Sequence, residues 1–283
     1  MSASPESRED IIRQFGVTTD FNPGREIERR IIFLKDYLLA SGMRTYVLGI
    51  SGGVDSLTAG LLAQEAVRRL RQTIAGIEFI AVRLPYGVQA DEDDAQKALA
   101  VIVPDRTMTI DIKEAADSIL QAAVLAGLSF ADGDQRDFVL GNIKARQRMI
   151  AQYTLAGALQ GLVIGTDHAA EAVMGFFTKH GDGAADILPL AGLTKRQVRS
   201  LASMLGAPDE LVFKVPTADL ETNRPQRPDE DAHGVTYEQI DDFLEGKPVE
   251  DEARQRILST FRTTAHKRAL PVAANEIGLS LPK

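Results

Sequence analysis

Residues 51–56, Ser-Gly-Gly-Val-Asp-Ser, combine residue types that can bind a phosphate group together with a divalent cation. They follow an apolar run that ends at Ile50 and precede an apolar-periodic segment, which predicts a strand, a glycine turn and the start of a helix. Glycines let backbone N–H groups approach an anion, and a helix N-terminus adds unpaired donors. Asp55 is itself an anion, so it fits this site when a divalent cation lies between it and the phosphate.

The spacing of this turn separates it from two common nucleotide-binding loops. The chain has no G-x-x-x-x-G-K-[ST] segment, the loop of enzymes that transfer γ-phosphates, and no G-x-G-x-x-G follows the strand. The six residues resemble instead the pyrophosphate loop of N-type ATP pyrophosphatases, which split ATP into AMP and pyrophosphate. The structural alternative is a strand-to-helix turn that uses glycines without binding a ligand.

A second acidic pair lies four residues apart, at Asp167 and Glu171. On a helix these carboxylates would share a face, where they repel each other unless a cation lies between them. Oxygen ligands suit Mg²⁺, so Glu171 is a candidate metal ligand beside Asp55; a solvated acidic helix start is the alternative. His168 belongs to no H-E-x-x-H motif, which gives no support to zinc hydrolysis, and we expect His180 and His233 in solvated polar loops.

Three basic segments could bind a phosphate-bearing ligand. Thr194 is a candidate N-cap of a helix whose first turn holds Lys195 and Arg196. Cations there oppose the helix dipole, which is explained if an anion binds at this point, and Lys195 is the candidate for the ATP phosphates. The glycine-rich turn 179–186 and the basic residues 266–268 are weaker signals, because glycine turns and cations at helix ends are common.

The bulk composition restricts the class of protein. The chain has 283 residues and a charge of 32 − 40 = −8, which argues against a nucleic-acid partner. It has no cysteine, so disulfides, thiolate metal sites and a cysteine nucleophile are excluded. The polar start is not a signal peptide and no apolar run reaches the length of a membrane span, so we expect a cytoplasmic enzyme without a membrane partner.

Alternating patterns predict an α/β fold, a Rossmann-like parallel sheet flanked by helices on both faces. The expected strands are 46–50, 78–84, 107–112 and 162–165. The expected helices are 26–39, about 55–70, 91–100, 112–126, 136–160, 237–244 and 251–262. Ligands bind at the carboxyl ends of such strands, where segments 49–56, 83–89 and 165–171 would meet.

Two segments depart from this pattern. Residues 216–234 hold prolines, a glycine and many charges without a core-facing pattern, which indicates a mobile substrate-covering loop or a plain connector. Apolar residues nearly encircle helix 136–160, so it is buried on more than one side, in a subunit interface or in the core. We expect one domain over residues 1–283.

Taken in order, these segments resemble the ammonia-dependent NAD⁺ synthetases. The matching segments are 49–56, 83–95, 141–148, 165–171, 175–179, 188–190 with 193–195, 214–216 leading to 219–220, and 266–268. The resemblance runs from about residue 10 onward with no departure at a motif position. It implies the adenine nucleotide alpha hydrolase-like fold and a homodimer with substrate sites at the subunit interface.

The resemblance also implies a role for individual residues. It places Mg²⁺ on Asp55 and Glu171. It places deamido-NAD⁺ on Arg146, Lys179, Asp186, His266 and Lys267. It places ATP on Gly49, Ile50, Ser51, Gly52, Gly53, Val54, Asp55, Ser56, Arg83, Gln89, Thr166, Lys195 and Thr217.

The implied reaction amidates deamido-NAD⁺ with ammonia and ATP, through an adenylated carboxylate, to give NAD⁺, AMP and pyrophosphate. Glutamine-dependent relatives carry a glutaminase domain with a cysteine nucleophile, which this chain lacks, so ammonia is taken directly or from a separate partner. Two alternatives are a tRNA-modifying adenylating enzyme and a non-enzymatic adenine-nucleotide sensor. The first calls for a basic surface, and the second would not need Asp55, Glu171 and Lys195 together.

Overall fold

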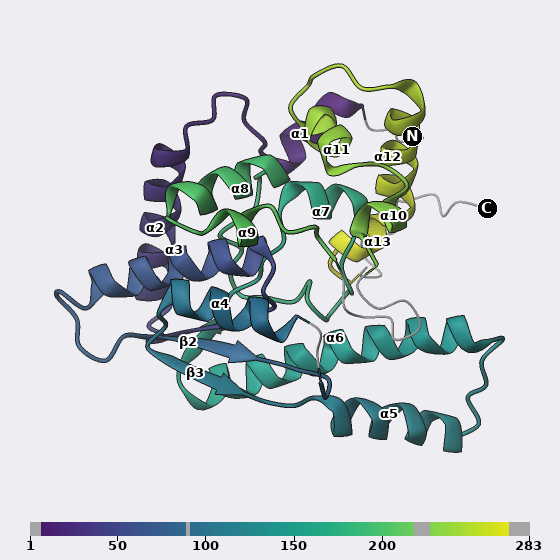
Figure 1. The fold of residues 1–283 in the computed structure, drawn as a ribbon, viewed down its shortest axis with the longest axis horizontal. Coiled ribbons are helices and arrows are strands. Elements are labelled where there is room, and N and C mark those ends of the chain that lie inside the picture. The colour runs from purple at the N-terminus through teal and green to yellow at the C-terminus, as the bar shows by residue number, and fades with distance from the viewer. Residues whose placement is uncertain (1–6, 89–90, 218–226, 272–283) are drawn as a thin grey trace.

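The computed structural model describes residues 7–88, 91–217 and 227–271 (Figure 1). Its strands are β1 (Thr45–Gly49), β2 (Glu78–Arg83), β3 (Arg106–Thr109) and β4 (Gly161–Val163). Its helices are α1 (Arg8–Phe15), α2 (Pro23–Ala40), α3 (Val54–Leu70), α4 (Glu92–Ile102), α5 (Lys113–Leu125), α6 (Gly133–Ala158), α7 (Ala169–Met174), α8 (Lys195–Met204), α9 (Asp209–Val212), α10 (Asp229–His233), α11 (Tyr237–Leu244), α12 (Asp251–Thr263) and α13 (Ala265–Arg268).

The strands form one parallel sheet in the order β3-β2-β1-β4. The central strand β1 alternates between the two faces, because side chains of successive strand residues point in opposite directions. Tyr46 and Leu48 pack in one core cluster and Val47 packs in another. The predicted parallel sheet with helices on both faces is therefore confirmed.

Helices α2, α3, α4 and α8 bury their apolar residues in the larger cluster, on the face of Tyr46 and Leu48. Helix α6 covers the opposite face through Ala151 and Ala156, and α5 packs on α6 through Leu120 and Leu140. A third cluster joins α1, α7, α11 and α12 beside the sheet. In Figure 1 these helices form a group of their own above α6. This group matters for function because α7 carries Glu171 toward the strand ends.

The predicted helices were mostly right, with ends that differ by a few residues. The structure adds α1, α9, α10 and α13, which the patterns did not predict. It also corrects the placement of Asp167, since α7 begins at Ala169 and Asp167 lies before it rather than on a shared helix face. No helix in the described ranges is long and apolar enough to cross a membrane.

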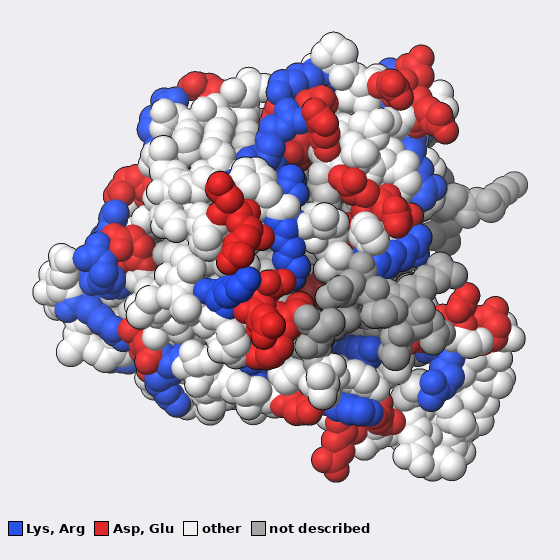
Figure 2. All heavy atoms as spheres, viewed as in Figure 1, with Lys and Arg blue, Asp and Glu red and all other residues white. Residues whose placement is uncertain are grey.

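Helices α5 and α6 form a hairpin that extends beyond the sheet (Figure 1). The prediction that α6 is buried on more than one side is confirmed in part, because it packs on both the sheet and α5. Large apolar side chains on the pair nevertheless stay exposed, among them Ile119, Leu125, Phe138 and Ile150. The end of the hairpin is mostly uncharged in Figure 2, whereas acidic and basic side chains are intermingled over the rest of the visible face.

Candidate active site

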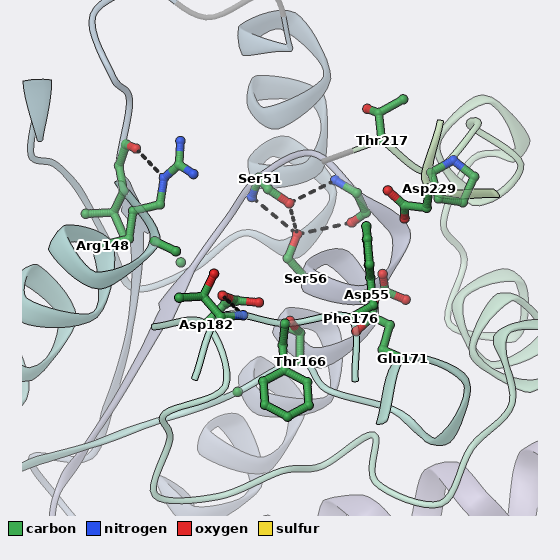
Figure 3. A pocket seen from close by; sticks show the side chains of 18 of the residues that line it. Ser51, Asp55, Ser56, Arg148, Thr166, Glu171, Phe176, Asp182, Thr217 and Asp229 are labelled. Carbon is green, nitrogen blue, oxygen red and sulfur yellow. Dashed lines mark hydrogen bonds between the residues drawn. The ribbon is translucent and has the colours of Figure 1, made fainter. Parts of the chain in front are cut away.

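A pocket of about 460 Å³ opens at the carboxyl ends of β1, β2 and β4. Its wall contains residues from 48–51, 82–84 and 164–166, so the three strand ends meet there as predicted. Segments 214–217 and 227–229 close the opposite side. Figure 3 shows Asp55 beside the turn after β1, with Glu171 and Asp229 near it.

The two glycines of the turn serve different purposes. Gly52 has φ +86°, and a Cβ added there would lie 2.8 Å from the backbone nitrogen of Ala95 in α4. A side chain would therefore strain the turn and collide with α4. Gly53 has an ordinary φ of −83°, and its nearest contact would be the Ser51 hydroxyl at 3.4 Å. Gly53 lines the pocket, so its missing side chain leaves room for a ligand instead.

The start of α3 is arranged as an anion site. Gly53 is its N-cap and supplies no side-chain hydrogen bond to the first helical turn. Ser51 and Ser56 hold the turn in shape: their hydroxyls lie 3.2 Å apart, and the Ser56 hydroxyl donates to the Gly53 carbonyl at 3.1 Å (Figure 3). Uncapped N–H groups and the positive end of the helix dipole favour a negatively charged ligand here.

Asp55 and Glu171 face each other with two basic residues beside them. Lys195 Nζ lies 2.7 Å from Asp55 Oδ2. His168 Nε2 lies 3.4 Å from Asp55 Oδ1 and 3.4 Å from Glu171 Oε1. Asp55, His168 and Glu171 each offer one ligand atom, and these three atoms lie within 4.8 Å of one another, a spacing that could hold a metal ion.

Burial and charge shift the proton equilibria of this group. Burial alone would raise the pKa of Asp55, but Lys195 and His168 hold it well below its usual range. Burial lowers the pKa of His168, and the carboxylates of Glu171 and Asp55 outweigh it and raise the pKa to about 10. Asp55 is therefore ionised at neutral pH and can bind a cation.

Three buried polar residues near Lys195 were not predicted from the sequence. Asp229 is 6% exposed and accepts a hydrogen bond from the Tyr237 hydroxyl at 3.1 Å, and burial raises its pKa to about 6. The Tyr237 ring lies 4.8 Å from Lys195 Nζ. The prediction of a solvated His233 was wrong, because it is 3% exposed and burial lowers its pKa to about 4.

Most of the residues predicted to bind ATP line this one pocket. They are Gly49, Ile50, Ser51, Gly53, Val54, Asp55, Ser56, Arg83, Thr166, Lys195 and Thr217. Gly52 does not line the pocket and faces α4, and Gln89 lies outside the described residues. Arg83 is buried and bound by the Ile50 carbonyl and by Glu92 at 2.6 Å, which ties the turn to α4. Gln152 was not predicted; its Oε1 accepts from the Gly49 nitrogen at 2.8 Å and fixes the end of β1.

The residues predicted to bind the dinucleotide separate into two places. Arg146 donates to the Lys179 carbonyl at 3.2 Å, and Lys179 Nζ donates to the His266 carbonyl at 2.6 Å, so α6, the glycine turn and α13 meet there. Lys267 lines the pocket and donates to the Gly175 and Phe177 carbonyls. Asp186 lies apart at the end of β4, where its carboxylate accepts from the Val163 nitrogen.

The cations at the start of α8 have a different explanation from the predicted one. An anion does bind this helix N-terminus, but the carboxylate of Asp241 in α11 supplies it. The backbone nitrogens of Lys195 and Arg196 donate to Asp241 at 2.9 and 2.8 Å. Thr194 is the N-cap, as predicted. The side chain of Lys195 points instead to Asp55, where it can reach a ligand in the pocket.

Comparisons with known proteins agree with this geometry. A family model described as NAD synthase matches residues 26–271. The chain is 62% identical over 264 residues to the NH(3)-dependent NAD(+) synthetase of Burkholderia pseudomallei, covering 93% of each chain. The chain therefore belongs to the NAD synthase family. The predicted resemblance and the predicted fold class are confirmed.

Two solved structures have an architecture similar to that of this chain. The crystal structure of NAD+ synthetase from Burkholderia pseudomallei superposes with a TM-score of 0.82 at 58% identity, over 96% of this chain and 100% of that chain. An NMN synthetase from Francisella tularensis superposes with a TM-score of 0.79 at 36% identity, over 90% of this chain and 100% of that chain.

Proposed function

We propose that this NAD synthase family member joins ammonia to deamido-NAD⁺ in an ATP-dependent reaction that forms NAD⁺, AMP and pyrophosphate. The observation that carries the proposal is the uncapped start of α3, where a glycine turn and an ionised aspartate share one pocket. The cytoplasmic location stays a prediction, and so does the substrate-covering role of residues 216–234, of which 218–226 lie outside the described residues.

A nicotinate carboxylate needs activation because its leaving group in a direct amidation would be oxide. In the proposed first step, a carboxylate oxygen attacks the α-phosphorus of ATP and pyrophosphate leaves. In the second step, ammonia attacks the acyl carbon, AMP leaves with the bridging oxygen, and the attacking nitrogen loses its proton. Ammonia needs no general base to attack if it arrives unprotonated, so the protein's task is to position the reactants and offset their charge.

The residues of the pocket divide this task between them. The backbone N–H groups at the start of α3 hold the β- and γ-phosphates, and Gly53 leaves room for them. Lys195 carries a positive charge to the departing pyrophosphate from a position fixed by Asp55 and Tyr237. Apolar strand ends at Ile50, Val82 and Leu84 give the adenine a surface to pack on.

The residues present fit a bound Mg²⁺. Asp55 Oδ1 is buried without a hydrogen-bond partner in the described part of the chain and faces Glu171. We assign the ion to Asp55 and Glu171 as protein ligands. Such an ion neutralises phosphate charge and stabilises the leaving pyrophosphate when it is bound.

We further propose that the protein is a homodimer that uses the α5–α6 hairpin. Exposed apolar side chains on both helices and the surface position of Arg146 on α6 support this face. Phe138→Lys on α6 should convert the dimer to a monomer in light scattering. Phe213→Lys is the matched control, because Phe213 is 61% exposed against 60% for Phe138 and lies outside the hairpin. Loss of the dimer in both variants would argue against this face.

The similarity to an NMN synthetase makes nicotinate mononucleotide, the carboxylate that amidation would convert to NMN, the second candidate substrate. The dinucleotide is favoured because Arg146, Lys179 and His266 assemble basic groups beside the pocket, where a second phosphate and nucleoside can bind. Comparison of kcat/KM for the two substrates distinguishes them. A higher value for the mononucleotide would reject the dinucleotide assignment.

One assay tests the whole proposal. The protein is incubated with ATP, Mg²⁺, ammonium and deamido-NAD⁺, and NAD⁺, AMP and pyrophosphate are measured. All three should form in equal amounts, and tRNA should have no effect. Asp55→Asn should nearly abolish turnover while leaving the fold intact. Wild-type rates of Asp55→Asn at saturating Mg²⁺ would reject the metal assignment.

A further inference from the structure

His168 stands out among the buried groups of the site, because the proposed reaction gives it no role. Its side chain is 0% exposed, its contacts with Asp55 and Glu171 are long ion pairs of 3.4 Å, and neither ring nitrogen makes a hydrogen bond in the described part of the chain. The Oδ1 atom of Asp55, 3.4 Å from His168 Nε2, is also buried without a hydrogen-bond partner in the described residues. Buried polar atoms without partners are uncommon in folded proteins, so several in one place indicate that a ligand is missing.

The two distances from His168 match those between ligands around a tetrahedral ion, and the ligand atoms of Asp55 and Glu171 lie within 4.8 Å of each other. His168 Nε2 lies 3.4 Å from a carboxylate oxygen of Asp55 and from one of Glu171, too far for a good hydrogen bond. Tetrahedral zinc with bonds of about 2.05 Å places neighbouring ligand atoms about 3.3–3.4 Å apart. Octahedral magnesium with bonds of the same length places them about 2.9 Å apart.

The chemistry of the three side chains agrees with this spacing. Magnesium prefers oxygen ligands, whereas an imidazole nitrogen beside two carboxylates suits zinc and other borderline divalent metals. Asp55 can serve such an ion through Oδ1 while Lys195 stays bound to its other oxygen, Oδ2. Asp55 and Glu171 line the pocket, so an ion has a path to the buried imidazole.

We propose that Asp55, His168 and Glu171 form a zinc site in the nucleotide-free protein, and that zinc releases the proton of His168 Nε2 to solvent when it binds. Because two of these ligands are the ones assigned to magnesium, bound zinc excludes the magnesium–ATP complex and inhibits the enzyme. Only this competition rests on the proposed function; zinc binding itself does not.

The sequence makes the site unusually easy to isolate by mutation. The chain has four histidines and no cysteine, so an imidazole or thiolate ligand for zinc can come from only four side chains. His180 is exposed in a turn and has φ +61°, a conformation that asparagine tolerates. His180→Asn is therefore the control for zinc bound at a surface histidine, and His168→Gln removes the imidazole from the site.

The test measures Zn²⁺ binding to the metal-free full-length protein without nucleotide, by competition with a coloured zinc chelator. Wild type and His180→Asn should bind one tight equivalent, and Co²⁺ in its place should give the intense visible bands of a four-coordinate site. Removing a residue that only hydrogen-bonds to a metal ligand weakens metal binding roughly 10–100-fold. His168→Gln removes a ligand itself, so it should lower the affinity for Zn²⁺ at least about tenfold. Asp55→Asn should do the same, which keeps the test valid if His168→Gln does not fold.

Wild-type protein that binds no tight Zn²⁺, or His168→Gln that binds it as wild type does, would overturn the inference. The same preparations are assayed for Mg²⁺-dependent NAD⁺ formation with and without Zn²⁺. Active protein without a zinc site would reject this inference alone. Zinc binding by a protein that forms no NAD⁺ would reject the proposed function and leave the site standing.

Discussion

The two adjacent glycines of the turn after β1 allow stability and phosphate binding to be separated. Gly52→Ala places a Cβ in a backbone conformation with φ +86° and 2.8 Å from the Ala95 nitrogen. The conformation alone costs about 1–2 kcal/mol for an L-residue, and the contact with α4 adds to it. We expect the free energy of unfolding to fall by about 2 kcal/mol or more.

Gly53→Ala should behave differently, because the N-cap conformation of φ −83° and ψ 156° is open to alanine. Alanine is a poorer N-cap than glycine, which lowers the free energy of unfolding by roughly 0.5–1 kcal/mol. Alanine also restricts the unfolded chain more than glycine does, which raises the free energy of unfolding by about 0.4–1 kcal/mol. The free energy of unfolding should therefore change little. The new methyl group points into the pocket, where it blocks the phosphates, so the KM for ATP should rise at least about tenfold.

Urea unfolding measures the first quantity and steady-state kinetics with varied ATP measure the second. A Gly52→Ala protein as stable as wild type would refute the argument from φ and from the contact with α4. A Gly53→Ala protein that is stable and has a wild-type KM for ATP would show that this turn does not hold the phosphates.

Two further predictions concern the substrate cluster and the buried carboxyl group before α7. Arg146→Ala should raise the KM for deamido-NAD⁺ roughly tenfold or more, because one charge-assisted hydrogen bond is lost, and leave the KM for ATP within about twofold. Arg136→Ala on the same helix is the control. Equal increases in KM for both substrates would contradict the assignment. Burial and, second to it, the charge of Glu171 raise the pKa of Asp167 from 3.8 to about 7. The folded state therefore binds this proton more tightly than the unfolded state, and the protein loses stability as the pH rises from about 4 to 7. Asp167→Asn removes this dependence, so its stability relative to metal-free wild type should grow over that range, by roughly 4 kcal/mol at most, and then level off; a difference that does not vary with pH would contradict the raised pKa.

Local patterns were sufficient to predict the sheet and the turn after β1. An apolar run followed by glycines and an aspartate predicts the strand, the turn and the helix start, because these three features are set by neighbouring residues. Helix α1 could have been found in the same way. Ser7 and Asp10 form a capping box in the structure, and their spacing is visible in the sequence.

The remaining site depends on contacts between distant segments. His168 is buried because α7 packs against α11, and Tyr237 stands about seventy residues later in the chain. Asp241 binds the start of α8 from 46 residues away, so the sequence showed the need for an anion but not its source. Asp229 was hidden in a segment whose prolines and charges indicate a loop. Periodicity has no means of pairing such residues.

The path of one oxygen atom tests the central claim most directly. Deamido-NAD⁺ labelled with ¹⁸O in its nicotinate carboxylate is converted with unlabelled ATP, and the products are analysed by mass spectrometry. If the carboxylate attacks the α-phosphorus while the turn at residues 51–53 holds the departing pyrophosphate, one ¹⁸O atom must appear in AMP and none in pyrophosphate. Unlabelled AMP, or ADP with labelled orthophosphate, would contradict the account.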